Sequence, residues 1–226
     1  MRPVKNNRRS VGLLVAALLG LAAIPAAAQT PATGSSDEWI NKLAAPETAP
    51  DLDLPALRQQ AADRIKARAK TDAAPLKRAL IAPDLVKLPQ VGVDIQFDED
   101  AAVVRPESYR TLGRIADTLY HPSLLGYKFL IVGHTVSTGK RDYNLTLSQR
   151  RADVIRDILI NTFKVSPKRL VTLGLGEEQL LDRAKPGSPV NQQIQIATIG
   201  SAIEASAPAA PAAVAPAKAG TKKQKR

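Results

Sequence analysis

The central part of the chain shows hydrophobic patterns typical of β-strands. Between residues 91 and 97, apolar side chains alternate with Gly92, Asp94 and Gln96, which predicts a strand with one buried face. Residues 127–132 form a nearly continuous apolar run, as expected of a strand that is covered on both faces. Shorter apolar runs at 170–175 and 194–199 predict two further strands.

Two segments between these strands have the three- and four-residue spacing of amphipathic helices. The first opens at Pro106 and stops before Pro122. The second is predicted over residues 148–163, with Ser148 as its N-cap. The resulting order β-α-β-α-β-β over residues 90–200 predicts a small α/β sandwich, in which two helices cover one face of a mixed sheet.

The residues before this domain form a Pro- and Ala-rich leader (29–89) that contains one amphipathic segment. Between residues 55 and 70, apolar side chains recur at three- and four-residue steps, which predicts a short helix beginning at Pro55. We expect this helix to pack on the domain or to fray in water. A membrane-surface or partner helix is the alternative, although its stripe contains only three large apolar residues. The rest of the leader is predicted to be mobile up to residue 55 and to be a proline-punctuated linker up to residue 89.

The first 28 residues have the layout of an export signal. Four basic residues within positions 2–9 precede an uncharged stretch from Val11 to Ala28, which closes on three alanines. We expect cleavage after Ala28, because small residues suit a signal peptidase. An uncleaved anchor is the alternative, since about eighteen uncharged residues approach the length that spans a bilayer.

Composition and charge exclude several functions. The 226 residues include no cysteine and two histidines, so the chain can hold no disulfide, thiolate zinc site or Cys nucleophile, and no cofactor is predicted. Residues 90–200 carry fourteen basic against twelve acidic residues, whereas residues 201–226 carry five against one. This distribution argues against nucleic-acid binding, which needs a basic face on the folded body. The Ala/Pro-rich tail is expected to be disordered, and its basic tip either attracts anionic lipids and envelope proteins or stays solvated.

Four short motifs follow one another within the predicted domain. They are Gly133-His134-Thr135-Val136-Ser137-Thr138-Gly139, Tyr143-Asn144 with Leu147-Ser148-Gln149-Arg150-Arg151-Ala152, Gly174-Leu175-Gly176-Glu177, and Asn191-Gln192-Gln193-Ile194. Together they resemble the OmpA-like C-terminal domain family, which includes OmpA, Pal and MotB tails. The resemblance covers about residues 90–200. It implies a domain that binds peptidoglycan noncovalently without cleaving it.

The resemblance also implies a ligand site, and this chain departs from it. In the family, an Asp after the Gly-His-Thr run receives the ammonium of meso-diaminopimelate, and an Arg in the Leu-Ser-x-x-Arg-Ala segment takes a carboxylate. Arg151 stands at the Arg position, and Asn144 and Thr135 are kept, but Val136 stands at the Asp position. Two further family arginines have become Gln192 and Gln193. The ligand motif is therefore degenerate. Removing one member of a buried charge pair costs about 2–5 kcal/mol of binding free energy, so weaker ligand binding is expected.

The sequence leaves two interpretations of Arg151 open. With Ser148 as N-cap, Arg150 and Arg151 would lie in the first helical turn, where the helix dipole disfavours cations. Either Asp153 or Asp142 compensates them within the protein, or Arg151 meets a carboxylate of a peptide stem. We therefore expect Arg151 to be partly exposed or paired.

These observations predict an exported, non-enzymatic protein of a Gram-negative envelope, periplasmic and associated with the outer membrane. Its partner would be the peptidoglycan stem peptide, bound weakly because Val136 replaces the family Asp. The alternative is an envelope protein-interaction module that no longer binds peptidoglycan and uses the basic tail or the 55–70 helix. A hydrolase is disfavoured, because no acid–base constellation can be placed.

Overall fold

A four-stranded sheet lies at the centre of the part of the chain that the structure describes. The computed structural model describes residues 35–44, 52–67 and 78–201, so the predicted export signal and the tail beyond Ser201 lie outside it. The strands, in the spatial order β1-β4-β2-β3, are β1 (Gln90–Val93), β2 (Tyr127–His134), β3 (Leu170–Gly176) and β4 (Ile194–Ser201). Strands β2 and β3 are parallel and the other pairs are antiparallel, which confirms the predicted mixed sheet.

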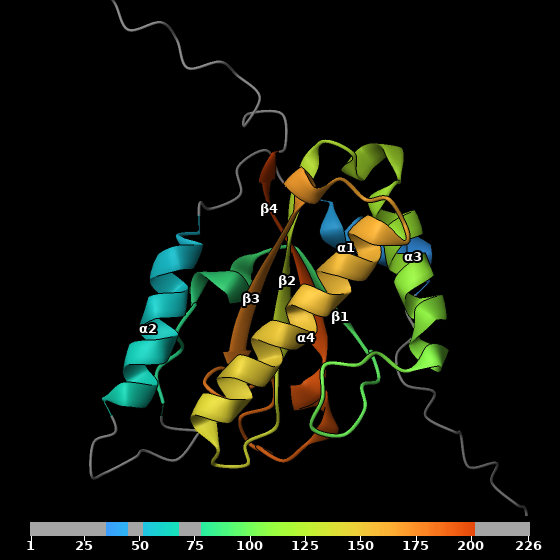
Figure 1. Ribbon diagram of the computed structural model, residues 1–226. Coiled ribbons are helices and arrows are strands. Elements are labelled where there is room, and N and C mark those ends of the chain that lie inside the picture. The colour runs from blue at the N-terminus through green and yellow to red at the C-terminus, as the bar shows by residue number, and fades with distance from the viewer. Residues whose placement is uncertain (1–34, 45–51, 68–77, 202–226) are drawn as a thin grey trace, which may run out of the picture. The chain divides into compact units, whose positions relative to one another are not determined.

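The two predicted helices pack on the same face of this sheet. They are α3 (Tyr109–Leu119), which a 3-10 turn at Pro106–Ser108 precedes, and α4 (Arg141–Asn161). Figure 1 shows α4 crossing in front of the sheet, with α3 to its side. Their shared core includes Leu112, Ile115, Phe129, Ile131, Ile155 and Leu159. Further single-turn 3-10 helices are η2 (Asp84–Lys87), η4 (Pro122–Leu124), η5 (Pro167–Arg169) and η6 (Pro189–Gln192). Within the described ranges, no helix combines the length and apolarity needed to cross a bilayer.

Helix α4 begins at Arg141, seven residues before the predicted N-cap. Ser148 lies inside the helix and is fully buried, so the prediction that it caps the helix is wrong. Its hydroxyl donates to the Leu145 carbonyl (2.8 Å) and accepts from the Gly176 N–H (2.8 Å). The Ser148 hydroxyl therefore hydrogen-bonds to strand β3 and does not cap a helix. Here a tertiary contact overrides the local preference of serine for the N-cap position.

The opposite face of the sheet is covered by residues that precede the predicted domain. Helix α2 (Leu54–Lys66) lies where the periodicity predicts a helix, and Asp53 caps it by accepting from the Ala56 N–H (2.9 Å). Ala61 of α2 packs with Ile81, Ala82, Leu85 and Leu88 against Leu130, Val132, Leu173 and Leu175 of the sheet. The predicted linker is therefore wrong from residue 81 onward, because its apolar residues complete a second core.

A helix also forms within the leader that the sequence predicts to be mobile. Helix α1 (Ser36–Leu43) begins after Ser35, whose hydroxyl accepts from the Glu38 N–H (3.2 Å). Trp39 and Leu43, one turn apart, are buried in the core beside α3. Arg114 of α3 lies over the Trp39 ring, 4.7 Å from its centre. The mobile-leader prediction is wrong for residues 35–44, because two large apolar side chains at this spacing dock a short helix.

Side chains satisfy the open edge of the sheet at β3. The carbonyls of Leu170 and Thr172 accept from Arg156 (3.1 Å) and Arg58 (2.5 Å). The N–H groups of two β3 glycines donate to side chains of α4, at Gly174 to Gln149 (2.7 Å) and at Gly176 to Ser148 (2.8 Å). An edge strand leaves such backbone groups without a strand partner, and here α2 and α4 supply substitutes.

Candidate functional site

The turn between β2 and α4 is held by one buried carboxylate. Glu177 follows β3, and one oxygen of its side chain accepts from the N–H groups of Thr138 (3.1 Å) and Gly139 (3.0 Å) and from the Asn144 amide (2.6 Å). Its other oxygen accepts from the Ser137 hydroxyl (3.1 Å). The structure therefore places Asn144, a predicted ligand residue, in the support of the turn.

A second buried carboxylate lies directly beside the first. Glu178 accepts two hydrogen bonds from Arg141 at the start of α4, at 2.5 and 2.7 Å. Arg78 stands 3.5 Å from Glu177 and 3.9 Å from Glu178. Both carboxylates are completely buried, so each depends on cationic or polar partners for its charge. Arg78, from the segment before the sheet, thus belongs to the support of this turn.

Arg151 lies in the middle of α4, on its buried side. Its Nε donates to the Ala101 carbonyl (2.9 Å), and its guanidinium lies over Phe97, 4.8 Å from the ring centre. The residue is only 7% exposed. Burial lowers the pKa of Arg151, while Tyr143 and Asp100 act in the opposite direction. No described residue accepts a hydrogen bond from its two terminal nitrogens, so these remain available to an anion.

The compensation that the sequence suggested for Arg151 does not occur. Because α4 starts at Arg141, Arg151 is not in the first turn and the dipole argument does not apply. Asp153 accepts from the Thr172 hydroxyl (2.6 Å) and from Gln149 (2.9 Å), and no ion pair joins Arg151 to Asp153 or Asp142 in the described ranges. Arg151 is therefore buried without an ion pair in the described part of the chain, and the expectation that it would be partly exposed or paired is wrong. A carbonyl and an aromatic face contact it instead.

The other residues of the family motif differ in how deeply they are buried. Thr135 is buried, and its hydroxyl has no partner among the described residues, while its N–H donates to the Gly176 carbonyl (3.1 Å). Val136 is half-buried on the same turn. Gln192 is exposed and Gln193 is half-buried. Neither glutamine is joined by a side-chain hydrogen bond to Arg151 within the described part.

Asn191 supports the turn from a neighbouring loop. It is fully buried, and its amide donates to the carbonyls of Asp182 (3.1 Å), Lys185 (3.0 Å) and Pro186 (3.2 Å). The Pro186 carbonyl also accepts from the Ser137 N–H (3.0 Å). Asn191 therefore fixes the loop against which the β2–α4 turn rests.

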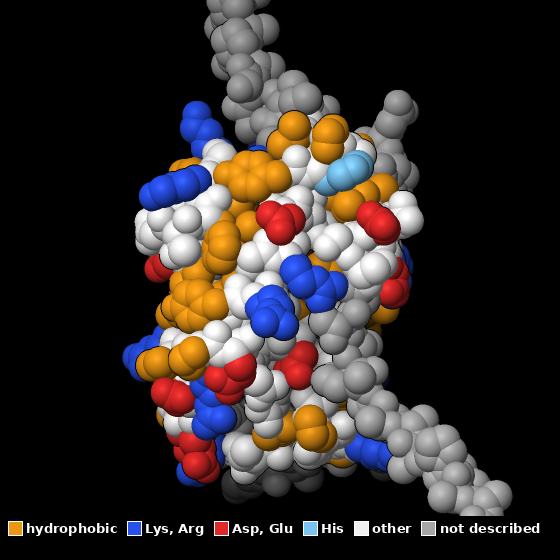
Figure 2. Space-filling view, turned by 90° about the vertical axis from the view of Figure 1, so that its right-hand side faces the viewer, with side chains coloured by type: hydrophobic (Ala, Val, Ile, Leu, Met, Phe, Trp, Pro, Cys, Tyr) orange, Lys and Arg blue, Asp and Glu red, His pale blue; other side chains and the backbone are white. Residues whose placement is uncertain are grey.

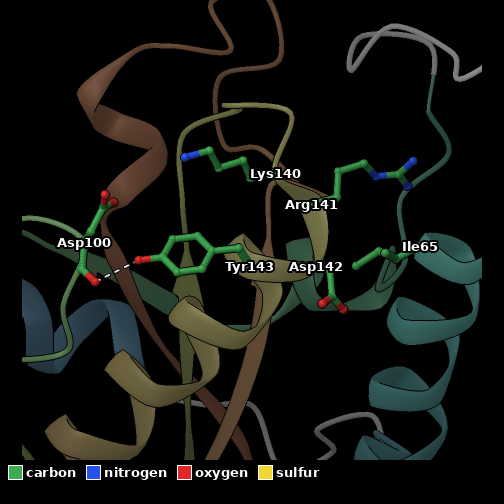
Figure 3. Close-up of a pocket in the computed structure, with 6 residues that line it drawn as sticks. All are labelled: Ile65, Asp100, Lys140, Arg141, Asp142 and Tyr143. Carbon is green, nitrogen blue, oxygen red and sulfur yellow. Dashed lines mark hydrogen bonds between the residues drawn. The ribbon is translucent and has the colours of Figure 1, made fainter.

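A cavity of about 570 Å³ opens beside the start of α4. Its lining residues are Ile65, Asp100, Lys140, Arg141, Asp142 and Tyr143. Figure 3 shows Lys140 extending toward the side occupied by Asp100, whereas Arg141 and Asp142 point elsewhere. The Tyr143 hydroxyl donates to the Asp100 carbonyl (2.8 Å), which ties the loop after β1 to α4. Charged groups of both signs thus surround the opening.

The surface of the described residues has no large basic area on the face toward α3. Figure 2 shows Lys and Arg side chains interspersed with Asp and Glu there, together with separate apolar groups. This mixture agrees with the near balance of charge over residues 90–200. A polyanion such as nucleic acid would find no continuous basic surface on that face.

His134, at the end of β2, is buried, and its ring joins two structural elements. Its Nδ1 donates to the Gln179 carbonyl (3.0 Å), and its Nε2 lies 2.8 Å from the side-chain amide of Gln195. Burial lowers the pKa of His134, and both hydrogen-bond partners oppose this effect only in part. This geometry is that of a structural histidine, whose ring is hydrogen-bonded to Gln179 and Gln195.

The lowered pKa of His134 predicts a specific loss of stability in mild acid. An unfolded histidine titrates near pH 6.5, so between this value and the lower folded pKa the unfolded chain binds more protons. We expect the free energy of unfolding to fall as the pH drops from about 7.5 toward 5. His134→Asn should remove this part of the slope in urea denaturation measured across that range. His121→Asn, a change at the exposed histidine, should retain it, and equal slopes for wild type and His134→Asn would refute the assignment.

Sequence reasoning missed three groups that shape this site. Glu178 and Arg78 lie outside the four motifs, and Arg78 precedes the predicted domain by twelve residues. Asp100 lies in the short acidic stretch Asp98-Glu99-Asp100 and belongs to none of the four motifs. The signal that could have found Glu178 is a second carboxylate directly after a buried strand, which needs a cationic partner.

Comparisons with known proteins agree with the motifs. Residues 96–194 match the model of the OmpA family. Outer membrane porin F of Pseudomonas aeruginosa is 33% identical over 116 residues, which are 50% of this chain and 32% of the porin. Peptidoglycan-associated lipoprotein of Mesorhizobium japonicum is 36% identical over 89 residues, 39% of this chain and 51% of the lipoprotein. The chain thus matches about a third to a half of each relative's length.

The cell wall anchor of the T6SS from Pseudomonas aeruginosa aligns with 66% of this chain and 99% of its own, at 24% identity and a TM-score of 0.40.

Proposed function

Because residues 96–194 match the model of the OmpA family, we propose that this chain attaches noncovalently to peptidoglycan in the envelope of a Gram-negative bacterium. In this proposal the domain is a binding module without enzymatic activity, and the stem peptide of the wall is its ligand. The names of the relatives support it, since one is an outer membrane porin and another a peptidoglycan-associated lipoprotein. The export signal would deliver the chain to the periplasm, close to the outer membrane.

The observation that carries this proposal is the state of Arg151. Ala101 and Phe97 fix its guanidinium, yet the terminal nitrogens are left without hydrogen-bond acceptors in the described part of the chain. The negative charge of Asp100, which lines the cavity, opposes the lowering of the Arg151 pKa by burial. A fixed guanidinium with free N–H groups suits a carboxylate, which it can bind in a bidentate manner.

In the same proposal, this chain binds the stem peptide more weakly than a family member that has an Asp at position 136. Val136 offers no acceptor to the ammonium that the family Asp receives, and Gln192 and Gln193 add no charge. The loss of one charge partner reduces affinity without removing the carboxylate contact at Arg151.

Restoring the carboxylate should strengthen wall attachment. We expect Val136→Asp to raise the affinity of the full chain for purified sacculi about tenfold, which corresponds to about 1.4 kcal/mol. Co-sedimentation over a range of sacculus concentrations measures this change. Val86→Asp, the same substitution at an exposed position of η2, is the matched control and should change the affinity little.

Two outcomes would count against the proposal. If neither wild type nor Val136→Asp pellets with sacculi, the chain is not a wall-binding protein. If only Val136→Asp pellets, the natural chain has lost this binding, and an interaction with envelope proteins becomes the better explanation.

A further inference from the structure

We propose that Asp100, at the edge of the cavity, supplies the carboxylate that position 136 lacks, so that Asp100 and Arg151 together take a ligand with an ammonium close to a carboxylate. Asp100 would receive the ammonium and Arg151 the carboxylate. The diaminopimelate residue of a stem peptide has this chemistry. The inference rests on the proposed function and names the residue that would restore its specificity.

Asp100 offers a free carboxylate at the cavity. Within the described residues its side chain makes no hydrogen bond or ion pair, whereas neighbouring Asp98 pairs with Arg105 (3.2 Å). Figure 3 shows Asp100 and Lys140 on the same side of the cavity, and Asp142 pointing away from them. No salt bridge of 4 Å or less joins Asp100 to Lys140 in the described ranges, so its charge is not neutralised by that cation.

The loop that carries Asp100 is fixed by the same helix that carries Arg151. Tyr143 donates to the Asp100 carbonyl (2.8 Å), and Arg151 donates to the carbonyl of the next residue, Ala101 (2.9 Å). A turn closes the loop through the Ala101 N–H and the Asp98 carbonyl (3.2 Å). The negative and the positive group are therefore presented by adjacent, mutually bonded segments.

The backbone conformation of Asp100 determines which substitution tests its carboxylate. Its φ of 50° lies in the left-handed region, which is unfavourable for most residues and best tolerated by Gly, Asn and Asp. Asn at this position keeps the local conformation and loses only the charge. Asp100→Asn is thus a conservative test of the carboxylate itself.

A chemical double-mutant cycle tests the inference. The probes are a diaminopimelate-containing muropeptide and the same muropeptide with the side-chain amine acetylated, titrated into the full chain by calorimetry. For the free amine, Asp100→Asn should bind three- to tenfold more weakly than wild type. Acetylation should weaken wild type by a similar factor and should scarcely affect Asp100→Asn, because the contact is already lost. Glu99→Gln, with the same charge change one residue away and outside the cavity lining, should match wild type.

The outcomes separate this inference from the proposed function. If wild type binds the muropeptide and Asp100→Asn responds to acetylation as wild type does, Asp100 is not the partner, while wall binding stands. A loss of the amine preference in Asp142→Asn instead would also overturn the inference. If wild type binds neither muropeptide nor sacculi, both proposals fail, and a Val136→Asp variant that binds would verify the assay.

Discussion

Changing Gly133 to alanine is expected to lower the free energy of unfolding by about 3 kcal/mol. A Cβ at this position would lie 2.1 Å from the Ser148 carbonyl oxygen and 2.9 Å from its carbonyl carbon. Both atoms belong to the backbone of α4, and Gly133 itself is paired with β3 and β4, so neither side can move without disturbing the sheet. Equilibrium urea denaturation of the full chain measures the effect.

Gly187→Ala is the matched control for this substitution. Among the described residues, no atom lies within 4 Å of a Cβ at Gly187, and Gly187 does not have a positive φ. We expect a change within about 0.5 kcal/mol, or a small gain from the less flexible unfolded chain. A Gly133→Ala variant as stable as this control would show that α4 does not lie directly on β2.

Replacing Glu178 with glutamine is expected to destabilise the domain by about 3–5 kcal/mol. The substitution removes the negative charge that faces Arg141, whose side chain is almost completely buried. Desolvation of the guanidinium is then no longer offset by its carboxylate. The free energy of unfolding, again from urea denaturation, is the measurement.

Two comparisons isolate this buried pair. Arg141→Met combined with Glu178→Leu should recover much of the loss, because apolar residues of similar volume need no compensating charge. Asp98→Asn removes an ion pair that is about half exposed and should cost less than about 1 kcal/mol. Equal effects of Glu178→Gln and Asp98→Asn would contradict the role assigned to burial.

The strand and helix order of the domain follows from patterns that are local in sequence. Alternation at 91–97 and the continuous apolar run at 127–132 indicate which strands have one or two buried faces. These signals fail where contacts distant in sequence decide the outcome. From its sequence position, Ser148 is predicted to cap a helix. In the structure its hydroxyl instead accepts a hydrogen bond from the Gly176 N–H of β3, and this bond exists only in the folded domain.

The supporting residues of the site were harder to predict for the same reason. Arg78 and Glu177 are about a hundred residues apart, and neither the composition nor the spacing of their surroundings indicates a contact. The motif resemblance does locate the turn at residues 133–139, and it assigns Asn144 and Arg151 to the ligand site. It cannot reveal that Asn144 binds Glu177, nor that Arg151 is anchored by Ala101.

The bonded edge of β3 limits how copies of this domain can associate. Strand exchange or fibril growth through that edge would first have to displace Arg58, Gln149, Ser148 and Arg156 from its backbone. Such exchange requires the loss of several hydrogen bonds before the first new one forms, which makes it slow even when many copies are crowded together. Self-association of this domain, where it occurs, is therefore expected through other surfaces.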